Sequence, residues 1–204
     1  MTASGWGKGF FSQLVAQRGY REPPDLYERL LGCTNDHSRE VCKRALGAAF
    51  PYDEIMVQFY DMQYQVAQER GMPLKAGFEE CMAGLKAMGI PCALATSTKR
   101  EVVEHYIAHT PPMQGCFDEM VCGGEAGRSK PAPDIYLEAA RRLGLSPREC
   151  VGVEDSFNGL RSLTAAGCVR VMIPDIIGFG WRFMPYVDHV LDDLSQLCGL
   201  IARR

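Results

Sequence analysis

Residues 151–159 read Val-Gly-Val-Glu-Asp-Ser-Phe-Asn-Gly, a short apolar run that passes into two adjacent carboxylates and then into a helix start. Paired acids at the end of a buried strand are costly unless a cation or hydrogen bonds compensate them. In open α/β sheets, ligands bind at the rim formed by the carboxyl ends of the strands. Mg²⁺ commonly uses one or two carboxylates there, together with waters and phosphate oxygens. The stretch therefore predicts a metal site at Glu154 and Asp155, although two acids before a helix can also serve only as cap and dipole partners.

On both sides of this stretch, from about residue 75 onward, strand-like and helix-like patterns alternate. The predicted strands cover 90–95, 119–122, 150–153 and 169–173, and the predicted helices cover 77–88, 99–108, 134–143 and 157–166. Short connections between alternating strands and helices require right-handed crossovers and a parallel sheet. Residues 75–204 are therefore expected to form an α/β domain.

Residues 1–74 show a different pattern, with helix following helix and no strand signal. Helices are expected near 14–19, 26–31, 36–48 and 52–70, and glycines follow several of them. The acid-poor start of the chain resembles a mitochondrial transit peptide, but its apolar spacing suits an ordinary helix with one buried face, and we favour the helix. This part is expected to be a small all-helical domain.

Composition excludes several classes of function. The chain has 204 residues, of which 47% are hydrophobic and 23% charged, which is ordinary for a soluble globular protein. A net charge of −3 gives no basic footprint for nucleic acid, and no apolar run is long enough to span a membrane. Nine cysteines without a C-x-x-C pair indicate buried thiols in a reducing compartment, which predicts a cytoplasmic protein.

Two further strand ends carry candidate binding groups. The strand at 90–95 is followed by Thr96-Ser97-Thr98, and hydroxyls with free N–H groups at a helix N-terminus can bind an anion, although Ser and Thr are also ordinary helix caps. Lys130 lies in the stretch Ser-Lys-Pro-Ala-Pro-Asp, where two prolines fix the backbone and Asp134 is placed to cap the next helix. A loop lysine is usually solvated, but this stiff frame indicates that its position matters.

A hydroxyl, a lysine and an acid pair at successive strand ends resemble the motifs of the haloacid dehalogenase superfamily, closest to its sugar-phosphate phosphatase and β-phosphoglucomutase-like branch. The resemblance implies that Thr96 binds the transferring phosphoryl group with help from the Ser97 backbone. It implies that Lys130 neutralises charge between nucleophile and phosphate, and that Glu154 and Asp155 hold Mg²⁺. The implied ligand is a small phosphorylated metabolite.

The resemblance covers essentially the whole chain. It implies a Rossmann-like parallel sheet in residues 75–204 and a helical cap in residues 1–74, whose helical stretch with Leu31–Thr34 resembles the cap that the family inserts after its first motif. β-Phosphoglucomutases usually carry an arginine a few residues after this point, but here none occurs before Arg39, which favours a phosphatase over a phosphomutase.

One motif of the family is missing. The family's mechanism needs an aspartate nucleophile and a second aspartate two residues later, and no D-x-D occurs anywhere in the sequence. Without the nucleophile no aspartyl-phosphate can form, and loss of the second aspartate alone costs about 10²–10⁴-fold in rate. The strand that carries this motif lies, in the family, between the strands ending at Thr96 and Glu154. Loss of this strand would leave backbone donors and acceptors of the two neighbouring strands unpaired in the interior, and each unsatisfied group costs about 1–3 kcal/mol of stability.

Three explanations stay open at this point: a truncated reading frame, which we favour, a strand supplied by another segment or chain, and a pseudoenzyme. The leading function is a Mg²⁺-dependent phosphohydrolase that is inactive in the form given. The alternatives are a non-catalytic module that binds a phosphorylated ligand or a partner, and a phosphomutase. A plain nucleotide-binding domain is disfavoured, because no G-x-G-x-x-G or phosphate-binding loop motif is present.

Overall fold

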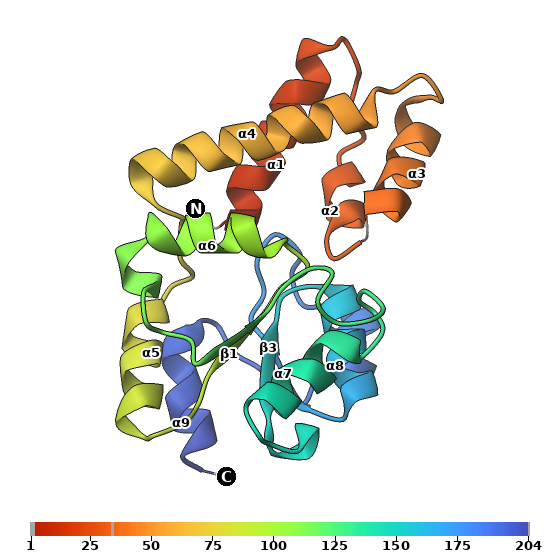
Figure 1. Ribbon diagram of the computed structural model, residues 1–204. Coiled ribbons are helices and arrows are strands. Elements are labelled where there is room, and N and C mark those ends of the chain that lie inside the picture. Colours follow the sequence, from red (N-terminus) through yellow and green to blue (C-terminus); the bar gives the residue numbers. More distant parts are fainter. Residues whose placement is uncertain (1–2, 34, 204) are drawn as a thin grey trace.

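The computed structural model describes residues 3–33 and 35–203, so Thr34 of the predicted cap motif lies outside the described residues. Figure 1 shows a helical part at one end of the molecule and an α/β part at the other. The helical part consists of α1 (Ala3–Gln17), α2 (Leu26–Leu30), α3 (Asn35–Leu46) and α4 (Tyr52–Arg70). The prediction of four successive helices is confirmed.

One apolar core holds these four helices together. Its buried members are Phe11, Leu14, Val15, Leu26, Val41, Cys42, Phe50, Tyr52, Ile55 and Phe59. α1 begins well before the expected segment, although its glycines lower helix propensity. The earlier start of α1 is explained by packing against α2. A glycine is needed at position 7 for this packing, because a side chain there would overlap the Tyr27 ring hydroxyl. This close approach between α1 and the start of α2 leaves no periodic signal in the sequence.

The α/β part alternates strands and helices as predicted. Its elements are α5 (Phe78–Ala87), β1 (Ala93–Ala95), α6 (Arg100–Ala108), β2 (Glu119–Val121), α7 (Asp134–Arg142), β3 (Val151–Glu154), α8 (Phe157–Ala166), β4 (Val169–Met172), β5 (His189–Val190) and α9 (Leu197–Ile201). β5 and α9 were not predicted. The α/β class with parallel strands is confirmed, since every strand pair is parallel.

The strands form two sheets instead of one. β1 pairs with β2, and β3 pairs with β4, which pairs with β5. β1 and β3 do not pair with each other, and a cavity of about 640 Å³ is lined by residues of both strands. This gap lies between the strands that end at Thr96 and Glu154, where the resemblance places the family's first strand.

Helices cover both faces of the sheets, which is the usual way to bury parallel strands. α7 and α8 pack on one face, where the core includes Val121, Leu160, Leu163 and Met172. α5 and α9 pack on the other, with Cys81, Leu85, Val171, Ile173 and Leu197. Gly152 in β3 allows α8 to approach closely, because a side chain there would overlap Leu163. Among the described residues, none of the helices has the length and apolar character needed to cross a membrane.

The helical part touches the α/β part along α4 and α6. The Tyr64 ring stacks on the His105 ring with centroids 3.6 Å apart, and the Met72 N–H donates to Thr110 Oγ1 at 2.8 Å. At a second point of contact, Asn158 Nδ2 donates to the Gly32 carbonyl at 3.1 Å. Because Asn158 lies in the first turn of α8, this second contact brings the loop after α2 next to the carboxyl end of β3.

Candidate functional site

The carboxyl end of β1 carries the predicted hydroxyl loop. The Thr96 N–H donates to the Val121 carbonyl at 3.0 Å and extends the β1–β2 ladder by one residue. Thr96 Oγ1 accepts a hydrogen bond from the Thr98 N–H at 3.2 Å, which fixes the turn, while Ser97 is exposed. Gly123 permits this turn to lie close to the end of β2, because a side chain there would overlap the Ser97 carbonyl. The turn thus offers a half-buried hydroxyl and an exposed serine at the end of β1.

Lys130 joins the ends of β1 and β3. Its Nζ lies 2.5 Å from Glu154 Oε1 and 3.5 Å from the Ala95 carbonyl, and it sits 4.8 Å from the centre of the Tyr136 ring. The lysine and glutamate side chains are each only 9% exposed. Ser162 Oγ anchors the proline-rich loop by donating to the Ala132 carbonyl at 2.6 Å. The lysine is therefore a fixed, buried charge and not a solvated loop residue.

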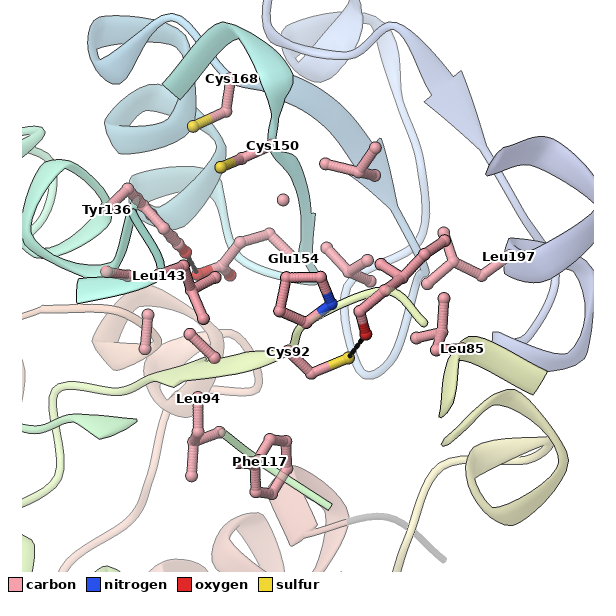
Figure 2. A pocket seen from close by; sticks show the side chains of 18 of the residues that line it. Leu85, Cys92, Leu94, Phe117, Tyr136, Leu143, Cys150, Glu154, Cys168 and Leu197 are labelled. Atoms are coloured by element: carbon pink, nitrogen blue, oxygen red, sulfur yellow. Dashed lines mark hydrogen bonds between the residues drawn. The ribbon is translucent and has the colours of Figure 1, made fainter. Parts of the chain in front are cut away.

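Glu154 is held by donors on both carboxylate oxygens. Oε1 accepts from Lys130 and from the Tyr136 hydroxyl, as Figure 2 shows for the tyrosine, and Oε2 accepts from Ser156 Oγ at 3.0 Å. Burial acts to raise the pKa of Glu154, but the charge of Lys130 and these hydrogen bonds hold it below its ordinary value. Glu154 therefore stays ionised and fixes Lys130 in place.

Asp155 lies beside this pair in a cluster of its own. Lys75 Nζ lies 3.4 Å from Asp155 Oδ2 and 3.4 Å from Asp175 Oδ2, and it lies between the two carboxylates. Burial and the nearby Glu154 raise the pKa of Asp155 above its ordinary value, although Lys75 acts in the opposite direction. Poor solvation of the buried carboxylate is the main cause and repulsion from Glu154 the second, and a cation at this point would relieve both.

The donor set fits Mg²⁺. No group of three or more His, Cys, Asp or Glu side chains suited to a metal occurs in the part of the chain that the structure describes. Mg²⁺ does not need one, because it keeps several waters and uses one or two carboxylates with phosphate oxygens. Asp155 is the better placed ligand of the predicted pair, since both oxygens of Glu154 already accept hydrogen bonds.

The structure brings the predicted residues together and adds three that the sequence did not single out. Thr96, Ser97, Lys130, Glu154 and Asp155 all lie at the carboxyl ends of β1 and β3, and Lys75, Tyr136 and Asp175 surround the acid pair. Asp175 follows β4 by three positions, so its place after a strand was a usable signal. Lys75 and Tyr136 gave no signal, because their roles depend on partners far away in the sequence.

The predicted cap at Asp134 is wrong. Pro133 precedes the helix, and Asp134 is the first residue of α7. Its carboxylate accepts hydrogen bonds from the Arg128 N–H at 3.0 Å and from the Arg128 side chain. The acid therefore closes the loop before Lys130 and does not cap the helix.

Gly159 provides a test of how tightly Glu154 is held. It is buried in the first turn of α8, and a side chain there would overlap the Glu154 carboxylate. We expect Gly159→Ala to lower the free energy of unfolding by about 1–3 kcal/mol, as overpacking usually does. Gly9→Ala, at an exposed position of α1 with no atom within 4 Å, should instead raise it by about 0.5–1 kcal/mol. Urea unfolding measures the change in the free energy of unfolding for both variants. Equal changes would show that the Glu154 carboxylate can move away from the added methyl group.

The sequence and the fold both match known proteins. A model of haloacid dehalogenase-like hydrolases matches residues 16–167. Protein CbbY of Rhodobacter capsulatus is 34% identical over 175 residues, which are 83% of this chain and 77% of that protein. The bifunctional riboflavin kinase/FMN phosphatase of Arabidopsis thaliana is 34% identical over 125 residues, 61% of this chain. The match spans only 32% of the plant protein's length.

A solved structure has the same overall fold. The crystal structure of CbbY from Rhodobacter sphaeroides in complex with phosphate superposes with a TM-score of 0.73 at 27% identity, over 94% of this chain and 88% of that one. The family match covers more than half of the chain and spans Thr96, Lys130, Glu154 and Asp155. This chain belongs to the haloacid dehalogenase-like hydrolase family.

Proposed function

We propose that residues 1–204 form the phosphate- and Mg²⁺-binding part of a phosphohydrolase that acts on small phosphorylated metabolites in the cytoplasm. One observation carries the proposal: Lys130 is buried and fixed between the Ala95 carbonyl and Glu154, with Asp155 as the next residue. The charge of a buried lysine at the meeting point of two strand ends is poorly screened and can attract an anion, even though Glu154 already pairs with it. The relatives include an FMN phosphatase and a CbbY structure with bound phosphate.

In this proposal each residue has a separate task. The Thr96 hydroxyl and the Ser97 N–H bind phosphate oxygens, and Lys130 neutralises their charge. Asp155 would hold Mg²⁺, with Glu154 adding negative charge behind it. A bound Mg²⁺ would polarise the phosphoryl oxygens and stabilise charge that develops on them.

Residues 1–74 act as the cap. The support is the hydrogen bond from Asn158 Nδ2 to the Gly32 carbonyl, which brings the loop after α2 against the first turn of α8. A cap in this position excludes water from the site and contributes side chains that select the substrate. Arg39 does not serve as a phosphate-binding arginine in this arrangement, because it lies 2.7 Å from Asp53 Oδ1 and 2.6 Å from Asp36 Oδ1. This supports hydrolysis over phosphoryl transfer within a sugar.

The proposed chemistry needs an aspartate that the sequence does not supply in a D-x-D motif. An aspartyl-phosphate route would therefore use an aspartate from outside residues 1–204. The second candidate function, a non-catalytic module that binds a phosphorylated ligand, has the same observation in its favour, because its binding residues are in place without the nucleophile.

A hydrolysis assay separates the two functions. We would compare residues 1–204 with a version of the protein extended upstream in its native reading frame, using p-nitrophenyl phosphate with and without Mg²⁺. The phosphohydrolase proposal expects Mg²⁺-dependent turnover only in the longer protein. No turnover in either form would favour the binding module, and turnover by residues 1–204 alone would contradict the assignment of the missing nucleophile.

A further inference from the structure

Lys75 lies in the segment that joins α4 to α5 (Figure 1). The backbone of this segment is fixed on both sides of the lysine. The Met72 N–H donates to Thr110 Oγ1 at 2.8 Å, and the Ala76 carbonyl accepts from the Leu194 N–H at 3.1 Å. The backbone therefore holds the base of the Lys75 side chain in place, while its flexible stem lets the ammonium group change partners.

The Lys75 ammonium group is shared between two carboxylates. Its Nζ lies 3.4 Å from Asp155 Oδ2 and 3.4 Å from Asp175 Oδ2, whereas Lys130 Nζ lies 2.5 Å from Glu154 Oε1. The Lys75 and Asp155 side chains are 26% and 30% exposed, against 9% for Lys130 and Glu154. Because Lys75 is more loosely paired and closer to solvent, breaking one of its contacts costs less than breaking the buried pair.

Lys75 and a metal ion compete for the same carboxylate. Asp155 is the better placed Mg²⁺ ligand, and the Lys75 ammonium lies next to its Oδ2. A divalent cation at Asp155 would be repelled by this ammonium at close range. A ligand that binds only when the lysine has moved away has an apparent affinity lowered by the fraction of protein in which the carboxylate is accessible. Asp175 already contacts Lys75, so the displaced ammonium keeps a negatively charged partner without any backbone movement.

We propose that Lys75 is a tethered counter-cation that holds the Asp155 carboxylate in the metal-free protein and moves onto Asp175 when Mg²⁺ binds. This inference rests on the metal site of the proposed function and adds the residue that sets the affinity of that site. In this role Lys75 is a positioning residue, because it acts on the metal through Asp155. It stabilises the metal-free site and makes Mg²⁺ binding weaker than the two carboxylates alone would allow.

Calorimetric titration of residues 1–204 with Mg²⁺ tests this competition. We expect Lys75→Met, which keeps a long side chain without its charge, to bind Mg²⁺ at least about tenfold more tightly than the wild-type chain. Its melting temperature should be lower than that of the wild-type chain without metal and should rise more on addition of Mg²⁺. Lys75→Gln, whose neutral amide still donates hydrogen bonds, should bind like Lys75→Met and replaces that variant in the comparison if the methionine does not permit folding.

Two control variants separate competition from a merely structural role. Lys75→Arg keeps the positive charge and should bind Mg²⁺ no more tightly than the wild-type chain. Lys86→Met removes an exposed lysine from the last turn of α5 and should change the affinity by less than about twofold, because exposed charges are screened by salt. A lysine that only supports the fold would weaken Mg²⁺ binding when it is replaced, whereas competition predicts the opposite direction.

Two double variants locate the effect. Asp155→Asn, added to Lys75→Met, should abolish the gain in Mg²⁺ affinity. Asp175→Asn removes the carboxylate that receives the displaced lysine, so it should weaken Mg²⁺ binding more in the wild-type background than in the Lys75→Met background. An equal effect of Asp175→Asn in both backgrounds would overturn the transfer of Lys75 to Asp175.

The remaining outcomes separate this inference from the proposed function. Unchanged or weaker Mg²⁺ binding by Lys75→Met, while the wild-type chain binds the ion, would overturn the inference and leave the proposed function in place. A gain that persists when Asp155 is also replaced would overturn the inference, because the ion would then bind elsewhere. Absence of Mg²⁺ binding in both the wild-type chain and Lys75→Met would remove the metal site itself, and with it the inference and the Mg²⁺ part of the proposed function.

Discussion

Replacing Lys130 by alanine should lower the free energy of unfolding by about 3–5 kcal/mol, the largest stability effect that we expect from a single substitution in the site. The lysine and Glu154 are each 9% exposed, and Nζ lies 2.5 Å from Oε1. Removal of the lysine leaves a buried carboxylate without its countercharge, although the Tyr136 hydroxyl still donates to it. Chemical unfolding of the purified variant measures the effect.

Two control variants test whether the loss of stability in Lys130→Ala comes from the buried, unpaired charge of Glu154. The double variant Lys130→Met with Glu154→Gln removes both charges at similar volume and should recover most of the loss, because a buried ion pair can often be replaced by neutral groups at little cost. Arg44→Ala breaks the exposed pair with Glu40, whose side chains are 68% and 70% exposed, and should cost less than about 1 kcal/mol. If Lys130→Ala costs no more than Arg44→Ala, the buried pair is not what holds the site together.

The same pair predicts how stability depends on pH. The pKa of Glu154 is held below its ordinary value, so its contribution is fully present above the unfolded-state pKa of about 4.3 and is lost as the pH falls through the folded-state value. The wild-type protein should therefore lose more stability on acidification below about pH 4 than the double variant does. Parallel pH profiles for the two proteins would contradict this assignment.

Asp155→Asn should weaken Mg²⁺ binding by more than about 10–100-fold, the usual cost of removing a group that only supports a ligand. Its effect on the metal-free protein should be small for two reasons. Lys75 keeps Asp175 as a partner at 3.4 Å, and the substitution removes a carboxylate whose pKa is already raised by burial and by Glu154. Calorimetric titration with Mg²⁺ and a thermal melt without metal measure the two effects.

Asp61→Asn serves as the matched control, because Asp61 is an exposed acid on α4, in the helical part. It should change neither Mg²⁺ affinity nor stability. A large drop in the melting temperature of metal-free Asp155→Asn would mean that Asp155 has a structural role. Unchanged Mg²⁺ affinity would remove it from the metal site.

The sequence was most informative where a chemical group follows a strand directly. Glu154, Asp155 and Thr96 each stand at the end of an apolar run, and the rule that parallel strands bring their carboxyl ends to one edge was sufficient to place them. Lys130 was found because two prolines mark its loop as rigid. The order of helices and strands followed from the change of hydrophobic period near residue 75.

Other features depend on contacts that no local pattern encodes. Tyr136 reaches Glu154 from α7 and Lys75 reaches Asp155 across 80 positions, so their roles are visible only in three dimensions. β5 has only two residues, too few for a period to be recognised. Asp134 is a residue type that often caps helices. Here its carboxylate instead accepts hydrogen bonds from the main-chain N–H and the charged side chain of Arg128.

In the proposed function, Lys130 and Asp155 act together at a single site on a phosphate and its metal. Calorimetric titration of residues 1–204 with inorganic phosphate, with and without Mg²⁺, tests this most directly. We predict phosphate binding that strengthens in the presence of Mg²⁺, and that Asp155→Asn loses this strengthening while it stays folded. Absence of phosphate binding by the folded wild-type chain, or a Mg²⁺ effect that persists in Asp155→Asn, would contradict the account.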